Sequence, residues 1–317
     1  MYTSIVVPLD GSPFGNRALP VALVLASRSD ALLHLVHVRE PNGLQGIGPV
    51  DARIYEGRER KVRAELSAIA TRLSGESSVR VEIRFLDGPV VPALQQYLSD
   101  GRHDLVVMMT HGRGGLSTSW LGSVADELTR QSPVPLLLLR QEPPWLSDAS
   151  EPLFHRVLVP LDGSSMADTV LDGVLSLATT DLTVLVLLTV IARVRLEAPD
   201  SDTDAITGPS HEVAGEREAA LSYLHGVAEE LRAGGAVVEV HVESRQSVAR
   251  GILDAANEQK VDLIALSTHG RGSLSRFIHG SIADKIVRGA AVPILVCCPA
   301  DARANPLVSR LESAAIA

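Results

Sequence analysis

Short runs of valine, isoleucine and leucine alternate along this chain with longer amphipathic segments. This alternation is typical of a parallel sheet with helices on both faces. In the N-terminal half, the pattern predicts strands at 3–9, 31–38, 79–86, 104–110 and 134–140. Helices are predicted at 12–28, 53–73, 90–100 and 122–131. Ser12 ahead of Pro13 is the expected N-cap of the first helix.

The chain contains an internal repeat that sets its domain organisation. Ile5–Ser12 (IVVPLDGS) returns as Val157–Ser164 (VLVPLDGS), and Asp104–Gly114 (DLVVMMTHGRG) returns as Asp262–Gly272 (DLIALSTHGRG). Repeats that keep their order indicate two copies of one module. In the second copy the pattern predicts strands at 156–161, 182–190, 236–243, 262–268 and 292–297, and helices at 164–179, 211–233, 247–259 and 280–289.

The stretch between the copies contains Pro143 and Pro144 and has the composition of a linker. We predict one domain at 1–142, a linker at 143–152, a second domain at 153–300 and a tail at 301–317. The predicted fold class is α/β, with two doubly wound parallel five-stranded sheets.

Charge and hydropathy narrow the function classes. The 317 residues include 29 basic and 38 acidic side chains, a formal net charge of −9, which disfavours nucleic acid as a partner. The longest apolar stretches fall short of the roughly 20 residues that cross a bilayer. No signal-peptide pattern is visible at the start, so we expect a cytoplasmic protein without a membrane partner.

Two strand-to-helix turns in each copy carry the candidate chemistry: Asp-Gly-Ser after the first strand and Thr-His-Gly-Arg-Gly after the fourth. Ligands of a doubly wound sheet bind at such turns. A glycine lets the backbone approach a phosphate, a helix N-terminus presents unpaired N–H groups, and arginine adds charge-assisted contacts. A phosphate or nucleotide site is therefore predicted from Asp10, Gly112, Arg113, Gly122 and Ser123, and from Asp162, Gly270, Arg271, Gly280 and Ser281.

Structural explanations of these residues stay open beside the functional one. Asp-Gly-Ser after a strand is also ordinary helix-capping chemistry, and glycine-rich turns are common. No P-loop motif occurs, and no dinucleotide fingerprint follows either first strand. His111 and His269 have no nearby sequence partner for an acid–base dyad, so we interpret them as loop-ordering residues. The strand histidines His34, His37 and His241 are interpreted as structural residues rather than metal ligands.

At these turns the chain resembles the universal stress protein family, in a tandem form, over about residues 1–300 except the linker. ATP-binding members of that family carry Gly-x2-Gly-x9-Gly-Ser/Thr after strand four, and both copies match its second and third glycines and its serine. Met109 and Ser267 stand where the first glycine belongs. Because methionine is bulky beside ribose or phosphate whereas serine is small, the second copy is expected to be the better site.

The resemblance implies a Rossmann-like fold with flavodoxin-type strand order 3-2-1-4-5 and ATP, with magnesium, as the bound cofactor. It implies that both aspartates meet the adenosine, that one proline per copy shapes the same wall, and that one valine per copy offers backbone groups to adenine. The additional residues are Pro8, Val38, Pro160 and Val190. Because the family dimerises through its last strand, we expect 134–139 and 292–296 to pair as an internal pseudo-dimer, with homodimerisation of chains as a further option.

These observations leave three hypotheses for the function. The leading hypothesis is an adenine-nucleotide-binding stress or regulatory protein without rapid turnover. One alternative is a nucleotide-independent protein-interaction module of the same fold, consistent with Met109. The other is a slow ATPase in which Asp10 or Asp162 helps to hold a metal on the phosphates. No strong catalytic constellation is visible, so weak ATPase activity is the most that we expect.

Overall fold

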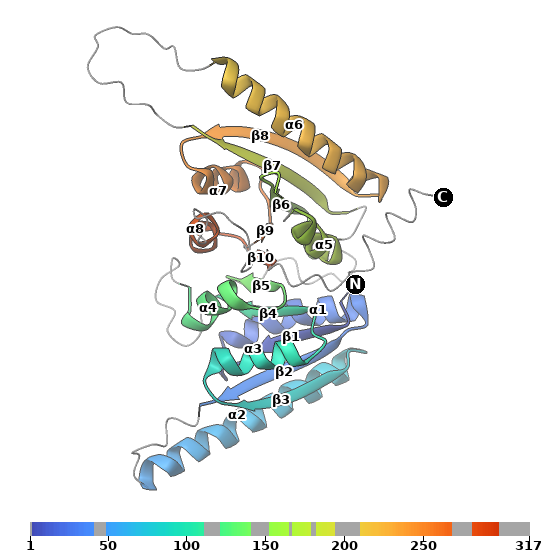
Figure 1. The fold of residues 1–317 in the computed structure, drawn as a ribbon. Helices are drawn as coiled ribbons and strands as arrows, with labels where there is room; N and C mark the ends of the chain where they lie inside the picture. The colour runs from blue at the N-terminus through green and yellow to red at the C-terminus, as the bar shows by residue number, and fades with distance from the viewer. Residues whose placement is uncertain are drawn as a thin grey trace, which may run out of the picture.

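The computed structural model describes residues 2–40, 49–110, 121–140, 152–164, 167–178, 182–193, 210–267 and 281–297. These residues form two similar α/β copies, one from each half of the chain (Figure 1). The elements of the first copy are β1 (Ser4–Pro8), the 3-10 helix η1 (Gly15–Ala18), α1 (Leu19–Ser29), β2 (Leu32–Arg39), α2 (Pro49–Glu76), β3 (Val81–Asp87), α3 (Val90–Asp100), β4 (Leu105–Met109), α4 (Ser123–Gln131) and β5 (Leu136–Leu139).

The second copy repeats this order without the 3-10 helix among its described residues. Its elements are β6 (Arg156–Pro160), α5 (Ala167–Leu177), β7 (Val184–Ala192), α6 (Ser210–Ala233), β8 (Val237–Arg245), α7 (Val248–Glu258), β9 (Leu263–Ser267), α8 (Ser281–Gly289) and β10 (Ile294–Cys297). Within these described segments, every helix is too short or too polar to cross a membrane.

All ten strands belong to one sheet, in the order β3-β2-β1-β4-β5-β10-β9-β6-β7-β8. Neighbouring strands within each copy are parallel, and each copy has the predicted order 3-2-1-4-5. The last strands of the copies meet in the middle and pair antiparallel, with Leu137 opposite Leu295. The expected internal pseudo-dimer is thus confirmed, and the two predicted sheets are halves of one continuous sheet.

The strands contribute side chains to two hydrophobic layers, one on each face of the sheet. In β1, Ile5 and Val7 belong to the layer that α1 and α2 cover, whereas Val6 belongs to the layer that α3 and α4 cover. In the central pair, Leu136–Leu139 and Ile294–Cys297 are all 0% exposed. Because helices cover both faces, the buried strands are continuous apolar runs rather than alternating ones.

The first helix begins later than the sequence pattern predicts. Ser12 Oγ accepts a hydrogen bond from the Gly15 amide at 3.1 Å, but η1 follows, and the α-helix starts only at Leu19. Pro20 gives the reason, because proline lacks an N–H and its ring clashes with the carbonyl four residues earlier. Proline is therefore tolerated only in the first turn of an α-helix, and here it stands in the first turn of α1.

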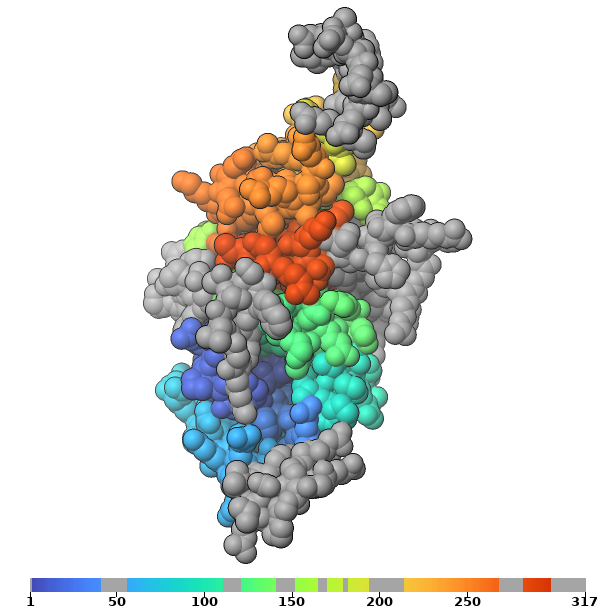
Figure 2. Space-filling view, turned by 90° about the vertical axis from the view of Figure 1, so that its left-hand side faces the viewer, coloured from blue at the N-terminus to red at the C-terminus, as the bar shows by residue number. Residues whose placement is uncertain are grey.

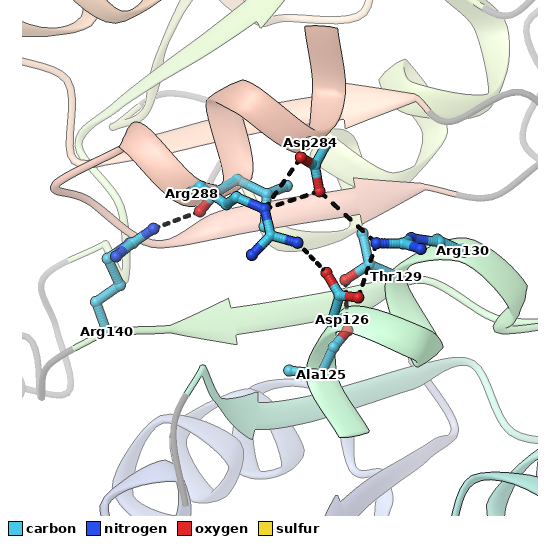
Figure 3. Close-up of polar contacts among 8 residues, drawn as sticks. Ala125, Asp126, Thr129, Arg130, Arg140, Asp284 and Arg288 are labelled. Carbon is cyan, nitrogen blue, oxygen red and sulfur yellow. Dashed lines mark hydrogen bonds and ion pairs between the residues drawn. The ribbon is translucent and has the colours of Figure 1, made fainter. Parts of the chain in front are cut away.

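A cluster of two aspartates and two arginines joins α4 to α8 beside the central strand pair (Figure 3). Arg288 contacts Asp126 of the other copy and, through Nε at 3.0 Å, Asp284 of its own helix. Arg130 contacts Asp126 at 2.7 Å. Asp284 and Arg288 lie 158 residues after Asp126 and Arg130, their equivalents in the first copy. Each copy thus contributes the same pair, as a two-fold interface between identical modules requires.

Further contacts close the same junction. The Arg140 guanidinium donates a hydrogen bond to the Val287 carbonyl at the end of α8. In the space-filling view, residues 281–297 (red) lie directly against residues 121–140 (green) (Figure 2). The two copies are therefore held together by backbone pairing, apolar burial and charge.

Replacing Asp126 by Asn removes the carboxylate that Arg130 and Arg288 share. We expect the free energy of unfolding to fall by about 1 kcal/mol, since partly exposed ion pairs contribute roughly 0.2–1 kcal/mol each. Urea unfolding at low salt is the measurement, with Glu127→Gln, an exposed residue on the same helix, as the charge-matched control. Equal unfolding midpoints for the two variants would show that the cluster does not stabilise the junction.

Candidate functional site

The candidate site lies where the strand order reverses in each copy. β1 and β4 are hydrogen-bonded neighbours, and so are β6 and β9. The chain leaves β1 for α1, which packs in one hydrophobic layer, and reaches α4, after β4, in the layer on the opposite face. Helices that leave adjacent parallel strands in opposite directions open a crevice at the carboxyl ends, where ligands of this fold class bind.

The turn after the first strand is built around an aspartate in both copies. Asp10 Oδ1 accepts the Ser12 amide at 2.9 Å, and Asp162 Oδ1 accepts the Ser164 amide at 3.0 Å. The glycine between the aspartate and the serine has a φ of 74° in the first copy (Gly11) and 77° in the second (Gly163). This left-handed conformation explains why glycine is needed at that position.

The two aspartates differ in their surroundings. A Cβ on Gly15 would lie 2.9 Å from Asp10 Oδ1, so the chain after the turn packs tightly against that carboxylate. Asp162 is exposed, and among the described residues its Oδ2 has no hydrogen-bond partner. The carboxylate of the second copy is thus the more accessible of the two.

A side chain on the second strand holds the peptide just before each aspartate. His37 Nδ1 lies 2.7 Å from the Leu9 carbonyl, and Thr189 Oγ1 donates to the Leu161 carbonyl at 2.8 Å. A carbonyl only accepts, so His37 carries its proton on Nδ1. Its other ring nitrogen lies 3.6 Å from Glu59 Oε1.

Sequence reasoning assigned His37 only a general structural role and missed Thr189. Thr189 lies 152 residues after His37, the same offset that separates the two aspartates. A side-chain donor at equivalent positions of both copies was the available signal. Two chemically different donors thus bind the equivalent carbonyl in the two copies.

In the first copy, residues on both sides of the loop after the fourth strand are tied together. The Thr110 amide donates to the Leu139 carbonyl at 2.8 Å, and the Gly122 amide donates to the Thr110 carbonyl at 2.7 Å. Gly122 is the N-cap of α4 and Ser123 its first residue. Because the Gly122 N–H is already used, the amides left for an anion at this helix begin at Ser123.

The residues at the first-glycine position of the motif lie in different environments. The Met109 side chain is 4% exposed and belongs to the hydrophobic layer on the α1 face. Ser267 ends β9, and its Oγ is a buried atom that has no hydrogen-bond partner among the described residues. An unpaired buried hydroxyl is unfavourable, which makes Ser267 a donor available to a group bound beside it.

The remaining predicted residues fall into two sets. Pro8 and Pro160 end the first strand of each copy, and Val38 and Val190 lie near the end of the second strand, at the same carboxyl edge of the sheet. Val190 packs toward α7, since a Cβ on Gly251 would lie 2.9 Å from its side chain. Ser281 begins α8. Gly112, Arg113, Gly270, Arg271 and Gly280 lie outside the described residues.

Comparison with known proteins gives a consistent family assignment. The model of the universal stress protein family matches this chain twice, at residues 1–140 and 153–297. A universal stress protein of Mycolicibacterium smegmatis is 26% identical over 304 residues, which cover 93% of this chain and 97% of that protein. One of Thermus aquaticus is 32% identical over 143 residues, which cover 44% of this chain and 100% of that protein. The first relative therefore matches both copies and the second matches one.

Solved structures share the fold. A universal stress protein from Archaeoglobus fulgidus superposes with a TM-score of 0.65 at 22% identity, covering 93% of this chain and 98% of its own. A putative universal stress protein from Pseudomonas aeruginosa gives a TM-score of 0.64 at 17% identity, with coverages of 100% and 98%. Together with the two matches to the family model, these relatives show that the chain belongs to the universal stress protein family and carries two of its domains in tandem.

Proposed function

We propose that this chain binds an adenine nucleotide, ATP, and acts through it as a stress-response or regulatory protein, with the second copy as the principal site. One observation carries the proposal. The Asp162 turn follows β6, and Ser267 is the last residue of the neighbouring strand β9, at the point where the strand order reverses. A carboxylate suits ribose hydroxyls, and a helix N-terminus suits phosphates.

The difference between the copies favours the second. Ser267 offers a small side chain with an unpaired buried hydroxyl, and Asp162 offers an accessible carboxylate oxygen. The equivalent positions of the first copy hold Met109, which is part of the core, and Asp10, against which Gly15 packs tightly. We therefore expect one strongly bound nucleotide per chain.

Each residue of the second copy has a role in this proposal. Asp162 accepts hydrogen bonds from the ribose, Pro160 forms the adjacent wall, and Val190 presents its backbone to adenine. By the family resemblance, Gly270, Arg271, Gly280 and Ser281 meet the phosphates, and magnesium neutralises part of the phosphate charge. The first copy offers the equivalent set Pro8, Asp10, Val38, Gly112, Arg113, Gly122 and Ser123 as a weaker site. A cytoplasmic location and binding without rapid hydrolysis belong to the same proposal.

Calorimetric titration with Mg-ATP tests the site directly. We expect about one nucleotide per wild-type chain, and Asp162→Ala should weaken binding about tenfold or more, since a hydrogen bond to a charged group contributes roughly 1.5–3 kcal/mol. Asp10→Ala is the matched control in the other copy and should leave the strong site unchanged. Equal losses in the two variants would contradict the assignment of the principal site to the second copy.

Exchanging the residue at the first-glycine position tests why the copies differ. Ser267→Met places in the second copy the residue that the first copy has, and we expect it to weaken Mg-ATP binding about tenfold or more because the longer side chain occupies space beside the ligand. Met109→Leu, a volume-conserving change in the core, is the control and should alter neither binding nor folding. Unchanged affinity in Ser267→Met would show that the size of this side chain does not determine nucleotide binding.

The same titrations separate the proposal from its main alternative. A nucleotide bound at 100 times its dissociation constant stabilises the fold by about 2.7 kcal/mol, which a thermal melt detects. If millimolar adenine nucleotide moves neither the melting temperature nor the calorimetric signal, the interaction-module hypothesis replaces nucleotide binding.

A further inference from the structure

A buried polar cluster occupies the amino-terminal ends of the strands in the first copy, at the edge opposite the candidate nucleotide site. It consists of His34 on β2, Tyr97 on α3, His103 just before β4, and Ser4 at the start of β1. His34 is 6% exposed and His103 is 7% exposed. Nothing in the proposed nucleotide chemistry uses these residues.

The three rings pack against one another. The His34 and His103 rings meet edge to face with centroids 4.9 Å apart, and the Tyr97 ring lies 4.5 Å from that of His103. Tyr97 Oη lies 3.0 Å from His34 Nδ1, and Ser4 Oγ lies 2.8 Å from His103 Nδ1. Each histidine therefore has a neutral hydroxyl, not a carboxylate, as its closest polar partner.

His103 has no partner for a second proton. Its Nε2 is buried and has no hydrogen-bond partner among the described residues. A Cβ on Gly101 would lie only 2.1 Å from this nitrogen, so the main chain of Gly101 packs closely against it. A protonated His103 would hold a buried N–H without an acceptor, which is costly.

The charged groups around the cluster do not offset this cost. Glu82 and Arg84 of β3 form an ion pair with each other, and Glu82 Oε2 lies 3.9 Å from His34 Nδ1. The Asp104 carboxylate accepts hydrogen bonds from the amide and hydroxyl of Thr3 and from the Ser4 amide. Both carboxylates near the histidines are therefore already paired with other groups.

These surroundings favour the neutral rings. Burial, followed by the neighbouring His103, lowers the pKa of His34 from 6.5 to about 4, although Glu82 acts in the opposite direction. Burial also lowers the pKa of His103, with Asp104 opposing it. Both histidines are thus neutral in the folded chain at neutral pH.

The second copy has aliphatic side chains at the three equivalent positions, and its histidines at this end, His155 and His241, lie 3.3 Å from Asp262 and 3.7 Å from Glu239. The sheet register places Val6 opposite His34 and the equivalent Leu158 opposite Val186. The Asp104 and Asp262 amides donate to the carbonyls of Ser4 and Arg156, which makes His103 equivalent to Val261. Tyr97 corresponds to Ala255, whose carbonyl likewise accepts the amide at the helix end. Val186, Ala255 and Val261 are all buried.

Charge at this end of the second copy is paired. Arg156, which stands where the first copy has Ser4, makes two hydrogen bonds to Glu239, at 3.1 and 2.7 Å. The hydrogen bond from Arg156 lowers the pKa of Glu239. This ion pair therefore stays charged at mildly acidic pH.

We propose that the His34–Tyr97–His103 cluster makes the first copy an acid-sensitive element of the protein: protonation of its histidines opens the first copy while the second copy stays folded. The direction follows from linkage. A histidine whose pKa is lower in the folded state binds its proton more readily once the copy opens, so stability is complete above about pH 6.5 and falls as the pH drops toward 4. Mild acid thus acts on one half of the chain and leaves the other half, with its candidate site, in place.

Hydrogen exchange of the full-length chain at pH 7.5 and pH 5.0, read by mass spectrometry and corrected for intrinsic exchange rates, tests this proposal. We expect the opening constant of peptides from β1, β2 and β4 to rise about tenfold or more at pH 5.0. Peptides from β6, β7 and β9 should change less than about threefold. Equal responses of the two copies in the wild-type protein would overturn the proposal without any variant.

Variants then assign the response to the cluster. His34→Val with His103→Val installs the residues of the second copy, and we expect it to abolish the pH response of the first copy. His225→Ala, at an exposed position of α6, is the control and should leave the response intact. If the double variant folds and keeps the wild-type response, the cluster is not the sensor. If it does not fold, titration of the wild-type histidine ring protons decides, because His34 must then titrate near pH 4 and His103 below its usual value.

Discussion

Each copy can bury both faces of its parallel sheet only if helices cover both sides, and this requirement forces the chain to leave neighbouring strands in opposite directions. The first and fourth strands of each copy are those neighbours. Their carboxyl ends are therefore the place where the aspartate turn of each copy and the chain leading to its last helix meet. The candidate site is thus a product of how the sheet is covered.

The presence of two copies on one chain removes the exposed edge that the last strand of a single copy would have. β5 and β10 are entirely apolar and would be exposed edges if the copies stood alone. Their antiparallel pairing removes both edges and creates the ten-stranded sheet, and the Asp126, Arg130, Asp284 and Arg288 cluster repeats the same two-fold relation in charge. Away from this junction, the two copies are less alike. They differ at the ligand-facing turn, at the donor that holds the aspartate peptide, and at the histidine cluster.

Much of this organisation could be predicted from local patterns. The repeated turns, the apolar runs and their spacing predicted the strands and the two copies. The strand order and the pairing of the copies came from the resemblance to the universal stress protein family. The start of α1 was placed wrongly because the capping signal at Ser12 outweighed Pro20, whose steric effect on the preceding turn decides the boundary. Sequence patterns predicted the turn residues of the candidate site, but the structure describes only some of these residues.

What local patterns could not predict are contacts between residues far apart in the sequence. The hydrogen bond from Thr189 to the Leu161 carbonyl, and the packing of His34 against His103, depend on which strands become neighbours. A lone threonine or histidine in an apolar strand gives no sign of its partner. For Thr189, comparison of the two copies offers a signal, because His37, a second side-chain donor, occupies the equivalent position of the first copy.

The central claim is that the second copy holds an adenine nucleotide. Native mass spectrometry of the purified full-length chain, before and after incubation with Mg-ATP, tests it most directly. We expect a species heavier than the bare chain by one adenine nucleotide, and the loss of that species in Asp162→Ala. A spectrum that shows only the bare chain under both conditions would contradict it.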